Sequence, residues 1–166
     1  MSAKEMTIFF PRTFDVEAIV PRLVSELGLE MQEIPAGKNF SFQASAMRGT
    51  GKSLLLMEYR KNAQNLIHEL SEWEKPSRTY IRLLLDCESS ITFYYRNIED
   101  ARSALFAIGS LHNTVANACV FDNDMGCLLI LSSILGNLQS DANWSWERTA
   151  FPDLPDVAAS EWEDDA

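Results

Sequence analysis

The sequence has few cysteines and no long hydrophobic run. Its three cysteines, Cys87, Cys119 and Cys127, include no CxxC pair, and such an odd, widely spaced set argues against a disulfide framework. The longest apolar cluster, residues 127–135, is interrupted by two serines and is far shorter than the ~20 residues that span a bilayer. We therefore expect reduced, buried thiols and a protein that does not enter a membrane.

The N-terminus lacks the features of a secretory signal peptide. Residues 1–11 contain one lysine, one glutamate and the short apolar run Ile8 to Phe10. A signal peptide needs a basic start, a longer apolar stretch and a small-residue cleavage site. This pattern predicts a cytoplasmic protein.

Basic residues are also scarce. The 14 lysines and arginines face 24 aspartates and glutamates, which gives a formal net charge of −10. Such a balance disfavours nucleic-acid binding through a basic surface. Hydrophobic residues make up 46% of the 166 residues and charged residues 23%, which is typical of one globular domain.

Much of the acidity lies near the C-terminus. Residues 141–166 contain eight acidic residues, one arginine and three tryptophans, a composition that does not indicate regular structure. We therefore predict a domain over residues 1–140 and a Trp-containing acidic C-terminal segment over residues 141–166. Two roles stay open for Trp144, Trp146 and Phe151, which could pack on the core of the domain or contact a partner.

Hydrophobic periodicity predicts an α+β domain. Strands are expected at residues 6–10, 39–46, 79–86, 90–95 and 118–121, and helices at 15–27 and 63–73 and from Asn97 onward. Residues 53–60 fit a strand or the start of a helix, and residues 128–138 fit a helix whose start could extend the preceding strand. Pro21 is expected to kink or divide the first helix, and Gly28 to end it. Helices separated by antiparallel hairpins indicate a mostly antiparallel sheet with helices packed on one face.

Twelve apolar residues lie on the apolar side of their local period and are expected to be buried. They are Phe9, Leu23, Phe42, Leu56, Leu66, Leu84, Phe93, Leu105, Ile108, Val120, Ile130 and Ile134.

The segment Ala46–Ser53 satisfies a relaxed phosphate-loop pattern. In a nucleotide site Lys52 would contact phosphates and Ser53 would bind magnesium. The preceding segment alternates polar and apolar residues, however, whereas the strand before a phosphate loop is apolar on both faces. The pattern therefore favours a hairpin turn with Gly49 or Gly51 at positive φ.

No catalytic or metal-binding set can be assembled from the sequence. His68 and His112 are isolated, and no ligand pair has zinc-type spacing. The segment Asp122–Gly126 is similar to part of a calcium loop but lacks the acid at the twelfth position, which favours a tight turn. We expect no cofactor, no metal and no enzymatic activity.

Acidic and aromatic side chains are the best candidates for binding a partner, because acids steer a basic protein and aromatics supply contact area. The candidates are Glu161, Trp162, Glu163, Asp164 and Asp165 in the C-terminal segment, and Glu99, Asp100, Asp122 and Asp124 in the domain.

The chain resembles the immunity proteins that bacteria pair with secreted antibacterial toxins. The resemblance rests on small size, acidity and the ending formed by Trp144–Arg148 and Phe151–Pro155. It implies direct, tight binding of a cognate toxin by covering its active site, with the partner a basic effector domain. Two alternatives stay open, a nucleotide-binding enzyme that uses Ala46–Ser53 and a cytoplasmic adaptor or chaperone.

Overall fold

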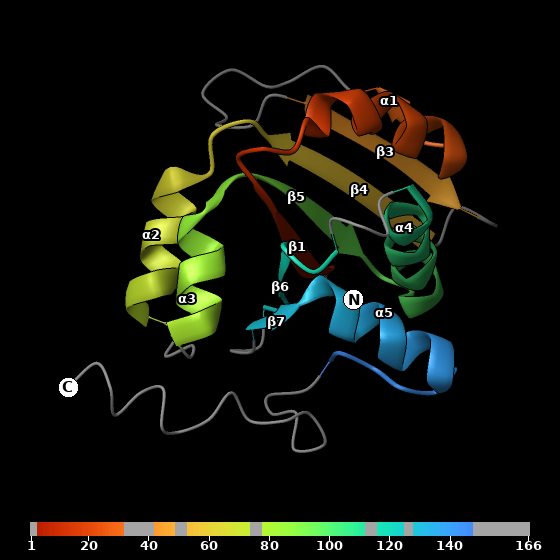
Figure 1. Ribbon diagram of the computed structural model, residues 1–166. Helices are drawn as coiled ribbons and strands as arrows, with labels where there is room; N and C mark the ends of the chain where they lie inside the picture. The colour runs from red at the N-terminus through yellow and green to blue at the C-terminus, as the bar shows by residue number, and fades with distance from the viewer. Residues whose placement is uncertain are drawn as a thin grey trace.

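The computed structural model describes residues 3–31, 42–48, 53–73, 78–111, 116–124 and 128–147. In chain order its elements are β1 (Lys4–Pro11), α1 (Val16–Glu26), β2 (Glu30–Met31), β3 (Phe42–Arg48), β4 (Ser53–Arg60), α2 (Gln64–Trp73), α3 (Arg78–Leu85), β5 (Cys87–Tyr95), α4 (Ile98–Leu111), β6 (Val120–Asp122), β7 (Leu128–Ile130) and α5 (Leu131–Ser140). The strands form one antiparallel sheet in the order β2-β3-β4-β5-β1-β6-β7 (Figure 1). The predicted α+β class with a mostly antiparallel sheet is confirmed.

The main hydrophobic core lies between one face of the sheet and helices α1, α4 and α5. Met6, Ile8 and Phe10 of β1 belong to it, together with Ile91 and Phe93 of β5. Alternate residues of a strand point to the same face of a sheet. The register pairs Met6 with Phe93 and Ile8 with Ile91, so the apolar residues of both strands meet on this face.

A second, smaller core lies on the opposite face of the sheet. Phe9, between Ile8 and Phe10, packs there with Val120 of β6 and with Ile67 and Leu84 of the pair α2 and α3. Figure 1 shows α2 and α3 side by side at the left, apart from α1, α4 and α5. Helices therefore pack against the sheet as expected, but they cover both faces rather than one, because α2 and α3 form a layer on the second face.

Helix α1 is continuous through Pro21 rather than divided there. Proline has no N–H, so the carbonyl of Glu17, four residues before Pro21, lacks its usual helical hydrogen bond. Pro21 and Glu17 are both exposed, so this carbonyl lies on the solvent side of the helix. Gly28 follows the helix with a φ of 63°, and the N–H of Leu29 donates to the carbonyl of Val24 at 2.9 Å. This left-handed glycine confirms the predicted end of the helix.

The strand predicted over residues 79–86 is wrong, because these residues belong to α3 and its end. A short apolar run does not distinguish a buried strand from a helix, and leucine and arginine favour helices. The predicted strands 79–86 and 90–95 therefore do not form a hairpin through residues 87–89. These residues begin β5, which pairs with β1 and β4 instead.

Strands β3 and β4 form the antiparallel pair that the hairpin prediction requires. Arg48 lies opposite Ser53, which begins β4. A phosphate loop needs a helix at this position, so Ala46–Ser53 does not form the strand–loop–helix arrangement of that motif. The positive φ expected at Gly49 or Gly51 lies outside the described residues.

Residues 128–138 combine both arrangements that the sequence allowed, since β7 is followed directly by α5.

Eight of the predicted core residues are buried: Phe9, Leu23, Leu84, Phe93, Leu105, Ile108, Val120 and Ile134. Leu56, Leu66 and Ile130 are half-buried, and the side chain of Phe42 lies outside the described part of the chain.

The start of the predicted C-terminal segment packs on the domain. Trp146 is fully buried and Trp144 is 9% exposed, both within the main core. These two tryptophans therefore belong to the core of the domain, which extends beyond Ser140, while Phe151 lies outside the described residues.

Within the described ranges, no helix combines the length and the apolar character needed to cross a bilayer.

Candidate functional site

The predicted partner-binding residues fall into a described and an undescribed set. Glu161, Trp162, Glu163, Asp164 and Asp165 all lie outside the described residues. Asp122 ends β6 and Asp124 follows it, whereas Glu99 and Asp100 lie in the first turn of α4. Only these four can be placed in the structure.

The structure places all four at one end of the sheet. Strand β1 begins where β5 ends, at the pair formed by Lys4 and Tyr95. Helix α4 begins three residues after Tyr95, which puts Glu99 and Asp100 at this end. Asp122 pairs with the fourth residue of β1, about 10 Å from its start at ~3.3 Å per residue. We call this region the acidic end of the sheet.

Asp122 and Asp124 form a compact group with Glu5 of β1, and we call these three residues the acidic cluster. The carboxyl groups of Glu5 and Asp124 share a side-chain hydrogen bond. The backbone N–H of Asp124 donates to Asp122 Oδ1 at 3.0 Å, and Asp124 has a φ of 62°. This tight turn after β6 keeps the two aspartates next to β1.

The electrostatics of the acidic cluster are unfavourable for its charged form. Burial, the hydrogen bond to Asp124 and the negative charges of Asp124 and Asp122 raise the pKa of Glu5 from 4.5 to about 7. A hydrogen bond with Tyr94 lowers the pKa of Glu5 and so opposes these effects. Each described charged group that shifts the pKa of Glu5 is acidic, so the surroundings of this carboxyl favour its protonated form.

A network of hydrogen bonds joins the acidic end of the sheet to residues 146 and 147. The indole N–H of Trp146 donates to the Tyr95 hydroxyl at 3.1 Å, and that hydroxyl donates to Glu147 Oε1 at 2.8 Å. Lys4 Nζ donates to Glu147 Oε2 at 2.9 Å. Asn123, between the two aspartates of the cluster, donates through Nδ2 to the carbonyl of Trp146 at 2.7 Å. The aspartates therefore sit on a backbone that is anchored on both sides.

The first turn of α4 is organised by its own cap. Asn97 Oδ1 accepts the backbone N–H of Glu99 at 2.9 Å, so Asn97 caps the helix expected from this residue onward. Arg102 pairs with Glu99 and donates through Nη2 to the carbonyl of Trp144 at 3.2 Å. This arginine joins α4 to residues 144–147 and neutralises part of the charge of Glu99. Glu99 is thus a weaker candidate for binding than Asp122 or Asp124.

Sequence reasoning missed Glu5 and Glu147. Glu5 precedes the apolar run from which the first strand is predicted. A carboxylate in a strand whose other residues are mostly apolar indicates a candidate functional residue. Glu147 adjoins Trp146, but only the tertiary structure shows that Lys4 and Tyr95 bind it.

The described residues contain no group of three or more histidine, cysteine or acidic side chains arranged to hold a metal ion. Cys87 and Cys119 are free and buried. Burial raises the pKa of both thiols to about 12, so neither is a reactive thiolate at neutral pH.

Comparison of the chain with known protein families, with curated proteins and with solved structures found no match.

The raised pKa of Glu5 predicts a pH-dependent stability. The folded state binds this proton more tightly than the unfolded chain, so the contribution of Glu5 is greatest below pH 4.5 and falls as the pH rises toward 7. Glu5→Gln stays neutral at every pH. We expect it to stabilise the protein by about 1–2 kcal/mol more at pH 8 than at pH 5, after allowance for the solvent contact of Glu5.

Urea unfolding of both proteins at the two pH values measures this difference. Glu26→Gln, at an exposed position of α1, is the matched control and should show the same effect at both pH values. An equal effect of Glu5→Gln at pH 5 and pH 8 would contradict the raised pKa.

Proposed function

We propose that this protein is a non-enzymatic binding protein of the bacterial cytoplasm, an immunity protein that neutralises a cognate toxin by covering the active site of its basic effector domain. The observation that carries the proposal is the acidic cluster of Glu5, Asp122 and Asp124, where carboxylates repel one another. A lysine or arginine of a partner placed here would replace this repulsion by attraction.

The geometry of the cluster favours recognition. Asp122 is 9% exposed and is held by strand pairing with β1, while the neighbouring Asp124 is exposed. A site fixed by strands and by the Trp146 network loses little conformational entropy when a partner binds. Proteins that bind basic clefts benefit from such a preorganised acidic surface because it raises the association rate.

The C-terminal residues add a second element to the proposal. Glu161, Glu163, Asp164 and Asp165 would steer the partner toward the protein, and Trp162 would serve as an aromatic anchor. Steering acids act mainly on the association rate, whereas a buried anchor acts mainly on the dissociation rate. The two roles can therefore be measured separately.

The test uses the toxin domain encoded beside this protein and surface-plasmon measurements of binding. We expect the double variant Asp122→Asn, Asp124→Asn to associate about tenfold more slowly at low salt, with a smaller difference at high salt. Asparagine keeps the side-chain oxygen that accepts the N–H of residue 124, so the turn is preserved. Glu26→Gln is the control variant and should leave the association rate unchanged.

Binding should also depend on pH. A partner cation favours ionised Glu5, so complex formation below about pH 7 releases a proton, and the affinity should rise as the pH increases toward 7. Glu5→Gln should remove this dependence.

A chain ending at Pro155 tests the terminal acids by its association rate, and Trp162→Ala tests the anchor by the lifetime of the complex. Absence of any complex with the neighbouring toxin would overturn the proposed function. Unchanged rates for the Asp122 and Asp124 double variant would remove the acidic cluster from the interface.

A further inference from the structure

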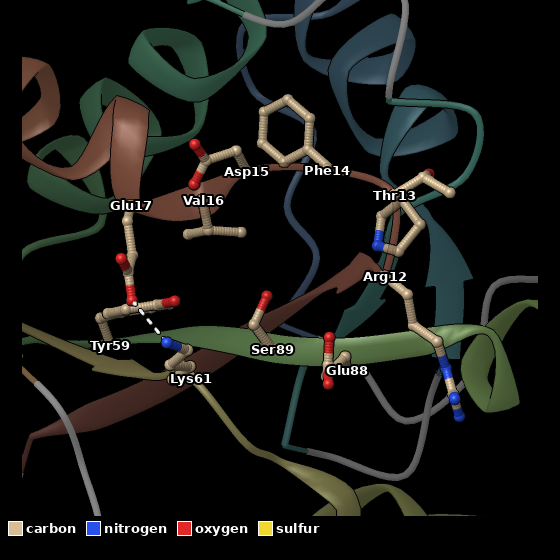
Figure 2. A pocket seen from close by; sticks show the side chains of 11 residues that line it. Arg12, Thr13, Phe14, Asp15, Val16, Glu17, Tyr59, Lys61, Glu88 and Ser89 are labelled. Atoms are coloured by element: carbon tan, nitrogen blue, oxygen red, sulfur yellow. Dashed lines mark ion pairs between the residues drawn. The ribbon is translucent and has the colours of Figure 1, made fainter.

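A cavity of about 310 Å³ lies at the end of β1 opposite to the acidic cluster. Its wall consists of the connection from β1 to α1, the first turn of α1, the end of β4 with Lys61, and the start of β5 (Figure 2). About 20 Å of β1 separates it from Glu5, at ~3.3 Å per residue. The cavity and the acidic cluster can therefore be altered independently.

Three exposed carboxylate side chains line this cavity. Asp15 and Glu17 come from the start of α1, and Glu88 comes from β5. All three act on the hydroxyl of Tyr59: burial first, then Glu17, Asp15 and Glu88, raise the pKa of this phenol to about 12. The field at Tyr59 is therefore negative and favours a cation.

Ser89 supplies a polar group in the cavity that is independent of the carboxylates. Its side chain is 7% exposed, and Figure 2 shows its hydroxyl directed into the cavity. No residue in the described part of the chain makes a hydrogen bond with this hydroxyl. The Ser89 hydroxyl is open to the cavity, so an N–H donor bound there can reach it and replace water.

The two basic residues that line the cavity leave its negative character intact. Lys61 Nζ lies 3.6 Å from Glu17 Oε1 in an ion pair whose side chains are both largely exposed, so this pair is weak. Arg12 donates to the carbonyl of Leu85 at 3.4 Å, and Figure 2 shows its guanidinium pointing away from the cavity. In Figure 2 the ammonium of Lys61 is directed toward Glu17.

We propose that this cavity binds a guanidinium group, supplied by an arginine side chain of the protein partner. A guanidinium has five N–H donors in one plane. The acceptors here, the carboxylates and the hydroxyls of Tyr59 and Ser89, lie on several sides of one cavity. A planar group with diverging donors satisfies such a set better than the compact ammonium of lysine. Only the source of the group rests on the proposed function, whereas its chemistry rests on the cavity.

The test titrates the ¹⁵N-labelled full chain with N-acetyl-arginine methylamide and follows its amide NMR signals. The matched probe is N-acetyl-citrulline methylamide, which has nearly the same shape and no charge. We expect the arginine probe to shift signals of residues 12–17, 59–61 and 88–89 with a weak, millimolar affinity. The citrulline probe should bind at least about fivefold more weakly.

Three variants locate the site. Glu88→Gln and Ser89→Ala should each weaken the arginine probe, Glu88→Gln by about fivefold or more, whereas the control Glu26→Gln should not. The amide spectrum of each variant also reports whether it is folded. Equal binding of both probes, or an unchanged affinity in Glu88→Gln, would overturn the proposal.

A second arm separates the sources of the guanidinium. If Glu88→Gln also weakens the complex with the basic toxin domain, the arginine of a protein partner is supported. If the probe binds but the complex is unaffected, a partner arginine is ruled out and a free guanidinium compound is the ligand. Failure of the probe with an intact toxin complex would sink the cavity proposal and leave the proposed function standing.

Discussion

Replacing Trp146 by alanine should lower the free energy of unfolding by about 3–5 kcal/mol. The indole is fully buried and packs edge-on against Tyr95 and Phe121, with ring centroids 6.2 Å apart in both pairs. Its N–H donates to the Tyr95 hydroxyl, so truncation removes that bond as well as apolar contact. The expected loss is a large fraction of the stability of a domain of this size.

Urea unfolding followed by circular dichroism measures this loss. Phe106→Ala is the control, because Phe106 is an aromatic residue of α4 that is 40% exposed and should cost much less. A Trp146→Ala protein with wild-type stability would show that residues 141–147 do not pack on the domain. The same variant should also loosen Asn123 and slow association with a basic partner, because Asn123 donates to the carbonyl of residue 146.

Replacing Leu84 by alanine should lower the free energy of unfolding by about 2–5 kcal/mol. Leu84 of α3 is fully buried in the second core, where it packs with Phe9 and Val120 of the sheet. The neighbouring Leu85 is 49% exposed and provides a control of the same residue type in the same helix. Leu85→Ala should change stability by no more than about 0.5 kcal/mol, since alanine is also a good helix former.

The ratio of these two effects tests the two-helix layer. Equal losses for Leu84→Ala and Leu85→Ala, or no loss for Leu84→Ala, would contradict the packing of α3 on the sheet. Thermal unfolding of the two variants in one buffer is sufficient for the comparison.

The hydrophobic pattern predicts most helices and strands, because each of them depends on residues that are close in sequence. The alternation around β1, the helical spacing that ends at Gly28 and the cap at Asn97 depend on residues close in sequence. The helix α3 was missed because its apolar run suits a strand and a helix alike, and packing on Phe9 decides between them.

The candidate site could be predicted only in part, for the same reason. Asp122 and Asp124 are predicted as acidic residues of a tight turn, which is a local property. Their partner Glu5 is more than one hundred residues away in sequence and reaches them only because β6 pairs with β1. No spacing rule connects such residues, since strand order is set by the competition among all apolar faces.

The sequence by itself determined the α+β class, the antiparallel sheet, the acidic balance and the burial of most core side chains, because period and composition act locally. The tertiary structure alone decided the strand order, the second helical layer and the place of Trp146. It also decided which carboxylates lie together, and hence the raised pKa of Glu5 and the cavity lined by Glu17, Tyr59 and Glu88. These features depend on contacts between segments that are distant in sequence, and such contacts form only in the folded chain.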